Sequence, residues 1–151
     1  MKNSKWLKIL IAIALFIAVG LLRDFIFVNW NYQLNATFHN KSFTYAHSFF
    51  DFLTTWSYST LYWGKWVLTA IFCLANFIIG YLYFTKKSIK NQLTYIYVVI
   101  GIVALIVFGL SYLGVNKAYT LSREIIGFLQ SPLPAILLYF VHRLIPEKSN
   151  N

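Results

Sequence analysis

Three apolar stretches, each long enough for one helix to cross a lipid bilayer, constrain this chain more than any other feature of its sequence. They cover residues 6–22, 61–84 and 93–113. The hydrocarbon core of a bilayer is about 30 Å thick and a helix rises about 1.5 Å per residue, so one crossing takes about 20 apolar residues. The composition agrees, since 59% of the residues are hydrophobic and only 11% are charged. The sequence therefore predicts an all-α polytopic membrane protein.

A fourth apolar segment is interrupted in its middle. Ser131, Pro132 and Pro134 stand where a stretch of helical periodicity at 121–130 gives way to a short apolar run at 132–145, which begins with the two prolines. Proline suits the first turn of a helix and breaks its interior, so we predict an interfacial helix over about 121–130 and a transmembrane helix over about 132–145. A helix of that length reaches only about 21 Å. To cross the bilayer, this helix must be extended by residues of the preceding segment, lie where the bilayer is thinned, or enter the membrane at an angle.

Basic residues predict how the chain is oriented in the membrane. They cluster at Lys2, Lys5 and Lys8, at Lys86, Lys87 and Lys90, and at His142, Arg143 and Lys148. With four crossings all three clusters lie on one side, and the positive-inside rule makes that side cytoplasmic. We expect a multi-pass protein of the inner (plasma) membrane with both termini in the cytoplasm. The alternative, a cleaved signal peptide, is disfavoured because the apolar run continues past Gly20 through Leu21 and Leu22.

The length of the chain limits its domain organisation. Its 151 residues can form one compact helical bundle, but not a membrane domain together with a second folded domain. We therefore expect a single integral membrane domain over residues 1–151, built as a four-transmembrane-helix bundle with short interfacial helices on its outer side.

The segment between the first two predicted crossings, residues 23–60, is too aromatic for a solvated linker. Aromatic side chains favour the headgroup region of a bilayer. Ser48 followed three residues later by Asp51 resembles the capping box that begins a helix. We predict an interfacial helix over about 48–58 within this long outer loop.

Several ionisable side chains are expected at the outer face of the membrane, where each is expensive and needs a partner or a use. They are Arg23, Asp24, His47, Asp51, Arg123 and Glu124, which we name the outer polar cluster. One interpretation is an ion-pair network that clamps helix ends. The other is a site for a substrate or a partner peptide, which requires a hydrated pocket where these side chains converge.

The sequence contains no recognisable catalytic, cofactor or metal-binding motif. Cys73 is the only cysteine and lies in the middle of the second apolar stretch, which favours a buried hydrophobic role over a nucleophile. We predict no catalytic residue, no cofactor and no metal site. Nucleic-acid binding is disfavoured because the basic residues flank apolar helices and form no single basic face. The net charge of +9 instead favours contact with anionic lipid.

Three stretches of the chain resemble a known group of proteins. They are LLRDFIFVNWNYQ after the first predicted helix, STLYWGKW at the start of the second and LSREIIGFLQSPLP before the fourth. Together with the layout of the chain, they resemble the small four-helix membrane proteins associated with exosortase-type sorting enzymes in bacteria. The resemblance implies an accessory role beside a membrane transpeptidase that processes exported proteins.

Two classes of function remain open. The first is a non-catalytic membrane accessory protein with a membrane-protein partner, which the lack of a nucleophile, metal set or cofactor loop favours. The alternative is a small transporter or intramembrane enzyme that uses a charged vestibule in the outer leaflet, which a broken fourth helix permits.

Overall fold

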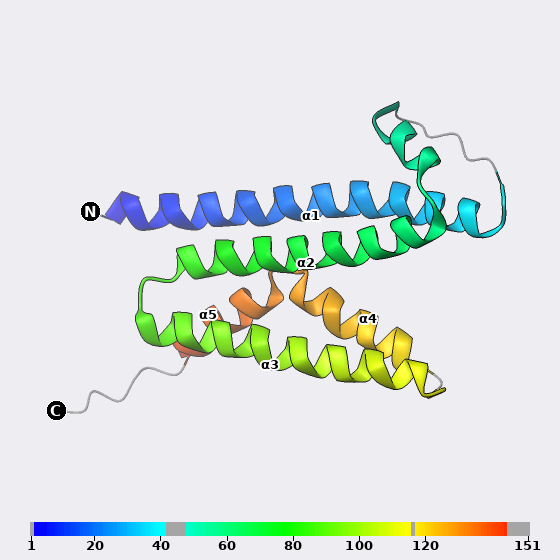
Figure 1. Cartoon of the computed structure of the whole chain (residues 1–151). Coiled ribbons are helices and arrows are strands. Elements are labelled where there is room, and N and C mark those ends of the chain that lie inside the picture. The colour runs from blue at the N-terminus through cyan, green and yellow to red at the C-terminus, as the bar shows by residue number, and fades with distance from the viewer. Residues whose placement is uncertain (1, 42–47, 116, 145–151) are drawn as a thin grey trace. The chain divides into compact units, whose positions relative to one another are not determined.

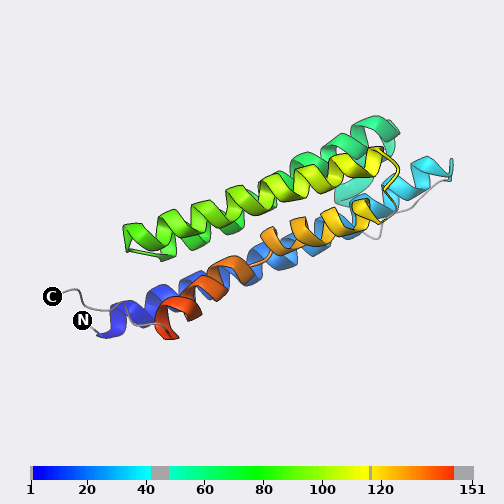
Figure 2. The same cartoon turned by 90° about the horizontal axis from the view of Figure 1, so that it is seen from below.

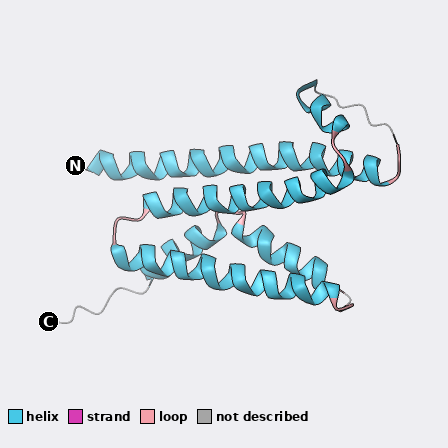
Figure 3. Ribbon diagram, viewed as in Figure 1, coloured by secondary structure: helices cyan, strands magenta, loops and turns pink. Residues whose placement is uncertain are grey.

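The computed structural model describes residues 2–41, 48–115 and 117–144, which form helices joined by short connections (Figure 1 and Figure 3). The elements are α1 (Lys2–Phe38), the 3-10 helix η1 (Ser48–Thr55), α2 (Tyr58–Tyr83), α3 (Lys87–Tyr112), α4 (Ala118–Leu129) and α5 (Leu133–Leu144). No strand occurs in this described part of the chain. The predicted all-α class is confirmed there.

Three of the described helices are long and apolar enough to cross a membrane. They are α1 over Trp6–Phe38, the whole of α2 and the whole of α3. α4 and α5 have 12 residues each, or about 18 Å, so neither crosses alone. Together they pass the same test as a pair bent by 59°. The helices therefore fit a membrane protein with three or four crossings, and the four-helix transmembrane bundle stays a prediction.

The helices divide into two compact units. One unit is residues 17–72, and the other joins the residues up to Phe16 with those from Cys73 onward. α1 and α2 each contribute to both units. The single membrane domain over residues 1–151 stays a prediction.

In the unit of residues 17–72, α1 continues far beyond the end predicted for it. The sequence prediction of a helix ending at Leu22 and a loop from Arg23 was wrong, because the helix runs to Phe38. No glycine or proline interrupts residues 21–40. Asn40 then adopts a left-handed φ of 52°, and the Lys41 N–H donates to the Ala36 carbonyl at 2.8 Å. This geometry is a common helix C-cap.

α1 is longer than a single membrane crossing requires. Its 37 residues extend about 56 Å, well beyond a hydrocarbon core of about 30 Å. A helix of this length either tilts strongly or extends into the interface.

The aromatic residues of the same unit build a small core. Trp30, Phe50, Leu53 and Leu61 are buried together, and Trp56 packs against them. The indole N–H of Trp30 donates to the Leu61 carbonyl at 2.8 Å, and the Trp30 and Trp56 rings meet edge to face at 5.5 Å. Some of the aromatic side chains predicted to lie in the headgroup region therefore pack against one another inside the protein.

The segment predicted to form an interfacial helix over about 48–58 is helical over a shorter range, and its position at the membrane interface stays a prediction. η1 ends at Thr55 and is a 3-10 helix, and α2 begins at Tyr58 rather than at residue 61. The Ser48 side chain of the predicted capping box lies outside the described side chains. Phe50 and Leu53, two of the most buried side chains in the unit, anchor η1 from its inner face.

In the other unit, α3, α4 and α5 contact one another. In Figure 1, α4 and α5 form a V whose apex lies beside the part of α2 that belongs to this unit. Seen from below in Figure 2, the same two helices follow one another along nearly one line. The predicted division of the fourth apolar segment into two helices is confirmed, with bounds of 118–129 and 133–144 in place of 121–130 and 132–145.

Hydrogen bonds satisfy the backbone where α4 and α5 meet. Ser131 donates to the Phe128 carbonyl through both its N–H, at 3.2 Å, and its hydroxyl, at 2.7 Å. The Gln130 carbonyl accepts a hydrogen bond from the side-chain amide of Asn76 on α2 at 2.9 Å. Asn76 is only 2% exposed. A buried asparagine thus supplies the donor that the broken helix lacks.

A second buried polar contact joins α3 and α4. The Ser122 hydroxyl donates to the Ala104 carbonyl at 3.0 Å, and both residues are buried. The small side chains where α3 and α4 meet let the two backbones approach closely, as is usual between membrane helices. An apolar core of Phe84, Ile89, Leu93, Ala135 and Leu138 holds the other end of the unit.

Substitution of Gly64 tests the packing of the aromatic core. A Cβ atom at Gly64 would lie 2.5 Å from Cζ2 of Trp30, whereas one at Gly20 would meet nothing within 4 Å. The Trp30 ring is held by its bond to Leu61 and cannot move aside freely. We expect Gly64→Ala to lower the free energy of unfolding in detergent by about 1–3 kcal/mol, the usual cost of overpacking, despite the higher helix propensity of alanine.

Gly20→Ala is the matched control and should leave stability unchanged or raise it. Thermal unfolding followed by tryptophan fluorescence measures both variants. Equal stability of the two variants would contradict this account of the core.

Candidate functional site

Arg23 and Asp24 are the members of the outer polar cluster that an ion pair joins. The Nε and Nη2 atoms of Arg23 donate to Oδ1 of Asp24 at 2.9 and 2.7 Å. The two residues are neighbours on α1, and the Asp24 side chain is 65% exposed. An exposed pair of this kind stabilises a protein by about 0–1 kcal/mol. Its contribution is local to α1, and it does not by itself clamp two helix ends.

The other members of the outer polar cluster are distributed over the chain. Asp51 is exposed on η1, and His47 lies outside the described residues. Arg123 and Glu124 are exposed neighbours on α4, where the Arg123 guanidinium lies 5.8 Å from the centre of the Tyr119 ring. Since the described members belong to both units, their convergence into a network or a vestibule stays a prediction.

Cys73 is partly buried on α2. Within the described residues, no group of three or more His, Cys, Asp or Glu side chains could hold a metal ion. The packing role predicted for Cys73 and the prediction of no metal, cofactor or catalytic residue stay predictions.

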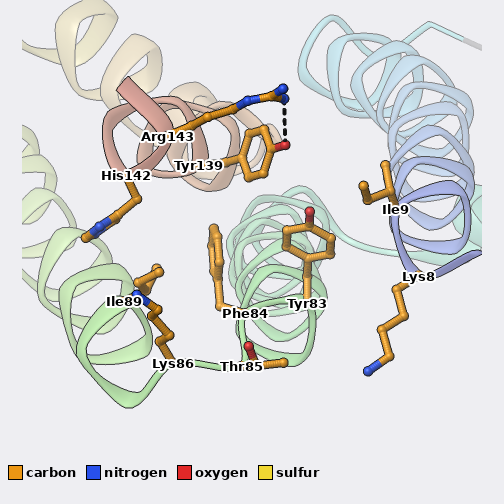
Figure 4. Close-up of a pocket in the computed structure, with 10 residues that line it drawn as sticks. All are labelled: Lys8, Ile9, Tyr83, Phe84, Thr85, Lys86, Ile89, Tyr139, His142 and Arg143. Atoms are coloured by element: carbon orange, nitrogen blue, oxygen red, sulfur yellow. Dashed lines mark hydrogen bonds between the residues drawn. The ribbon is translucent and has the colours of Figure 1, made fainter. Parts of the chain in front are cut away.

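A different set of residues surrounds a cavity of about 580 Å³ in the unit that contains α3, α4 and α5. Figure 4 shows these residues, which combine basic, phenolic and apolar side chains. We name the cavity the basic pocket. Its lining is Lys8, Ile9, Tyr83, Phe84, Thr85, Lys86, Ile89, Tyr139, His142 and Arg143.

Four parts of the chain bring these side chains together. α1 contributes Lys8 close to its start, and the end of α2 with the connector to α3 contributes residues 83–86. The connector is short because the Phe84 N–H still bonds to the Gly80 carbonyl and the Lys90 N–H already bonds to that of Lys86. Phe84 and Ile89 are buried on either side of it. Lys86 is thereby held at the rim of the pocket.

α5 supplies three polar side chains from its last turns. Tyr139, His142 and Arg143 follow the spacing of three and four residues that places side chains on one helix face. Nη1 of Arg143 donates to the Tyr139 hydroxyl at 3.1 Å, as the dashed line in Figure 4 marks. Nε2 of His142 and Oε1 of Gln92 on α3 share a hydrogen bond of 2.6 Å. These two bonds orient the basic end of α5.

The charges of the basic pocket all have one sign. Lys8, Lys86 and Arg143 are cationic, and none of the ten lining residues, all within the described part of the chain, is acidic. Charges of one sign around a cavity with apolar walls concentrate the electric field and attract counter-ions. The arrangement is suited to an anion.

Sequence reasoning assigned the same basic residues to membrane orientation and did not identify them as a site. The sequence did contain one signal for this site. The three basic clusters are expected on one side of the membrane, where they lie near one another. Which member of each cluster faces the others depends on helix rotation and on the bend between α4 and α5. Neither can be read from the order of charges along the chain.

The chain matches no protein-family profile, no curated protein and no solved structure.

Neutralising Asp24 tests whether its ion pair has more than a local role. We expect Asp24→Asn to lower the free energy of unfolding by at most about 1 kcal/mol, because the pair is exposed and joins sequence neighbours. Thermal unfolding in detergent measures the effect, with Asn29→Ala, which removes another local bond on α1 from Asn29 to the Phe25 carbonyl, as the reference. A loss of several kcal/mol for Asp24→Asn alone would support the clamp.

Proposed function

We propose that the chain is an integral protein of the inner membrane, with both termini in the cytoplasm, that acts as a non-catalytic accessory protein by binding another membrane protein. The resemblance of three stretches to proteins associated with exosortase-type systems supports a membrane transpeptidase that processes exported proteins as the partner. The observation that carries the proposal is an exposed apolar face of α3.

This face is a regular stripe along nearly the whole helix. It consists of Tyr95, Val98, Ile102, Leu105, Gly109 and Tyr112, all of which are exposed. We name it the α3 stripe. Its tyrosines are separated by about 26 Å of helix, close to the thickness of a hydrocarbon core, and tyrosine favours the two interfaces of a bilayer. The stripe thus has the dimensions of a surface that faces lipid or another membrane helix.

Two glycines favour a protein partner at the stripe. Gly101 and Gly109 lie one helical turn before and after Leu105, and a Cβ atom at either position would meet nothing within 4 Å. Leu105 itself is 66% exposed. Glycines beside an exposed apolar side chain let a second helix approach closely, which is the usual basis of association between membrane helices. A partner helix is therefore the occupant proposed here.

The second candidate is a small transporter or intramembrane enzyme, and the bend of 59° between α4 and α5 is the observation that favours it. Broken helices line substrate sites in many transporters. This candidate requires the outer polar cluster to surround a hydrated pocket. The basic pocket and a second cavity of about 480 Å³ beside Leu138 are both lined by other residues.

Site-specific photo-crosslinking tests the proposal. A photoreactive phenylalanine analogue replaces Leu105 in the α3 stripe or, as a matched control, Leu21 on α1, which is 68% exposed. After illumination of cells that express the full chain, we expect one discrete adduct with a membrane protein from position 105 and none from position 21. Mass spectrometry of the adduct identifies the partner.

Gly109→Leu should abolish this adduct while the chain remains in the membrane, because a large side chain blocks the approach of a helix. Lipid adducts alone at position 105 would contradict the accessory role. An adduct with a membrane protein other than a processing transpeptidase would retain that role and reject the exosortase assignment.

A further inference from the structure

We propose that the basic pocket binds the phosphate-bearing headgroup of an anionic phospholipid. The inference concerns the unit of α3, α4 and α5 and does not depend on the protein partner proposed for the α3 stripe. It rests on the charges, hydrogen-bond donors, dimensions and surroundings of the pocket.

The charges define the class of ligand. Lys8, Lys86 and Arg143 come from three separate parts of the chain, and the ten described residues that line the cavity include no carboxylate. Cations that share a cavity repel one another, and the repulsion is strongest where apolar walls lower the effective dielectric constant. A phosphate diester carries the negative charge that relieves this repulsion. The planar guanidinium of arginine can in addition bind two oxygens of one phosphate at the same time.

Hydrogen-bond donors are arranged beside these cations. The Tyr139 hydroxyl accepts a hydrogen bond from Arg143, so its own proton is directed elsewhere. Figure 4 shows the Tyr83 hydroxyl on the same side of the cavity as that of Tyr139, between α5 and Ile9 of α1. Two phenolic O–H groups and a guanidinium can therefore address one phosphate, with charge-assisted bonds that are stronger than neutral ones.

The volume fits a headgroup. The cavity of about 580 Å³ falls within the range of small-ligand sites, about 300–1,000 Å³. Phe84, Ile89 and Ile9 provide apolar wall beside the basic residues. A glycerophosphate group fits this combination, since its phosphate can reach Arg143 beside the two phenolic hydroxyls, its glycerol backbone can meet the wall, and Lys8 and Lys86 attract its charge from other sides of the pocket.

The surroundings favour a lipid over a free phosphate ion. The pocket lies where α1 begins and where α2 and α5 end, at the ends of segments that are apolar enough to cross a membrane. Lipid headgroups occupy that depth. Large apolar side chains continue along the helices from the pocket and are exposed, among them Leu10 and Ile13 on α1 and Leu82 on α2. These surfaces can cover the acyl chains of the same molecule.

Native mass spectrometry of the full chain in detergent tests the assignment. The probes are dioleoyl-phosphatidylglycerol, dioleoyl-phosphatidylcholine and inorganic phosphate. We expect one tightly bound phosphatidylglycerol and at least about tenfold weaker binding of phosphatidylcholine. Both lipids carry the same phosphate diester, but choline adds a quaternary ammonium group that the cations of the pocket repel. Inorganic phosphate should neither bind tightly nor displace the lipid.

Neighbouring lysines provide a matched control. Lys86 lines the pocket and Lys87 does not, although both are exposed and they carry the same charge. Lys86→Gln and Arg143→Gln should each weaken phosphatidylglycerol binding by about tenfold, whereas Lys87→Gln should change it by less than about twofold. Arg143→Lys should retain part of the affinity. Thermal unfolding confirms that each variant is folded, and Lys86→Gln alone decides the question if Arg143→Gln does not fold.

Three outcomes would overturn the proposal. Equal binding of the two lipids would show that the charges do not select the headgroup. Equal losses for Lys86→Gln and Lys87→Gln would indicate general attraction of the net charge for anionic lipid, without a site. Tight binding of inorganic phosphate that displaces the lipid would assign the pocket to a free anion instead.

Discussion

The hydrogen bonding of the backbone at the break between α4 and α5 is the constraint on which the unit of α3, α4 and α5 depends. Backbone polar groups at membrane depth must find partners within the protein, because lipid supplies none. Here Ser131 satisfies the Phe128 carbonyl, and Asn76 reaches from α2 to the Gln130 carbonyl. The break is thereby fixed against α2. A leucine at position 76 would fill similar space but leave that carbonyl without its donor.

The position of the break determines where α5 ends. Because the apex of the bent pair is held beside α2, α5 returns towards the α2–α3 connector and is packed there through Ala135 and Leu138 against Phe84 and Leu93. His142 and Arg143 consequently reach the cavity that Lys8 and Lys86 also line. The same bend that divides this apolar segment into two short helices thus brings the cationic residues among the described pocket lining together at the end of the unit.

The sequence predicted the features that follow from apolar length and from strong breakers. The helical class, the locations of α2 and α3 and the division at Ser131 and Pro132 belong to this group. It failed for residues 23–38, because a drop in hydropathy was interpreted as the end of a helix although no breaker occurs before Asn40. It also missed the basic pocket and the role of Asn76. Both depend on contacts between residues far apart in the chain, Asn76 with Gln130 and Lys86 with Arg143, that no local pattern specifies.

The most direct test of the account is which sides of the membrane the two ends of the bent pair occupy. Single cysteines at positions 117 and 144, both exposed in the structure, can be introduced in a Cys73→Ala background and labelled with a membrane-impermeant maleimide. If α4 and α5 form one crossing, position 117 reacts in right-side-out vesicles and position 144 only in inside-out vesicles. Reaction of both positions from the same side would make the pair a re-entrant loop and contradict a fourth crossing.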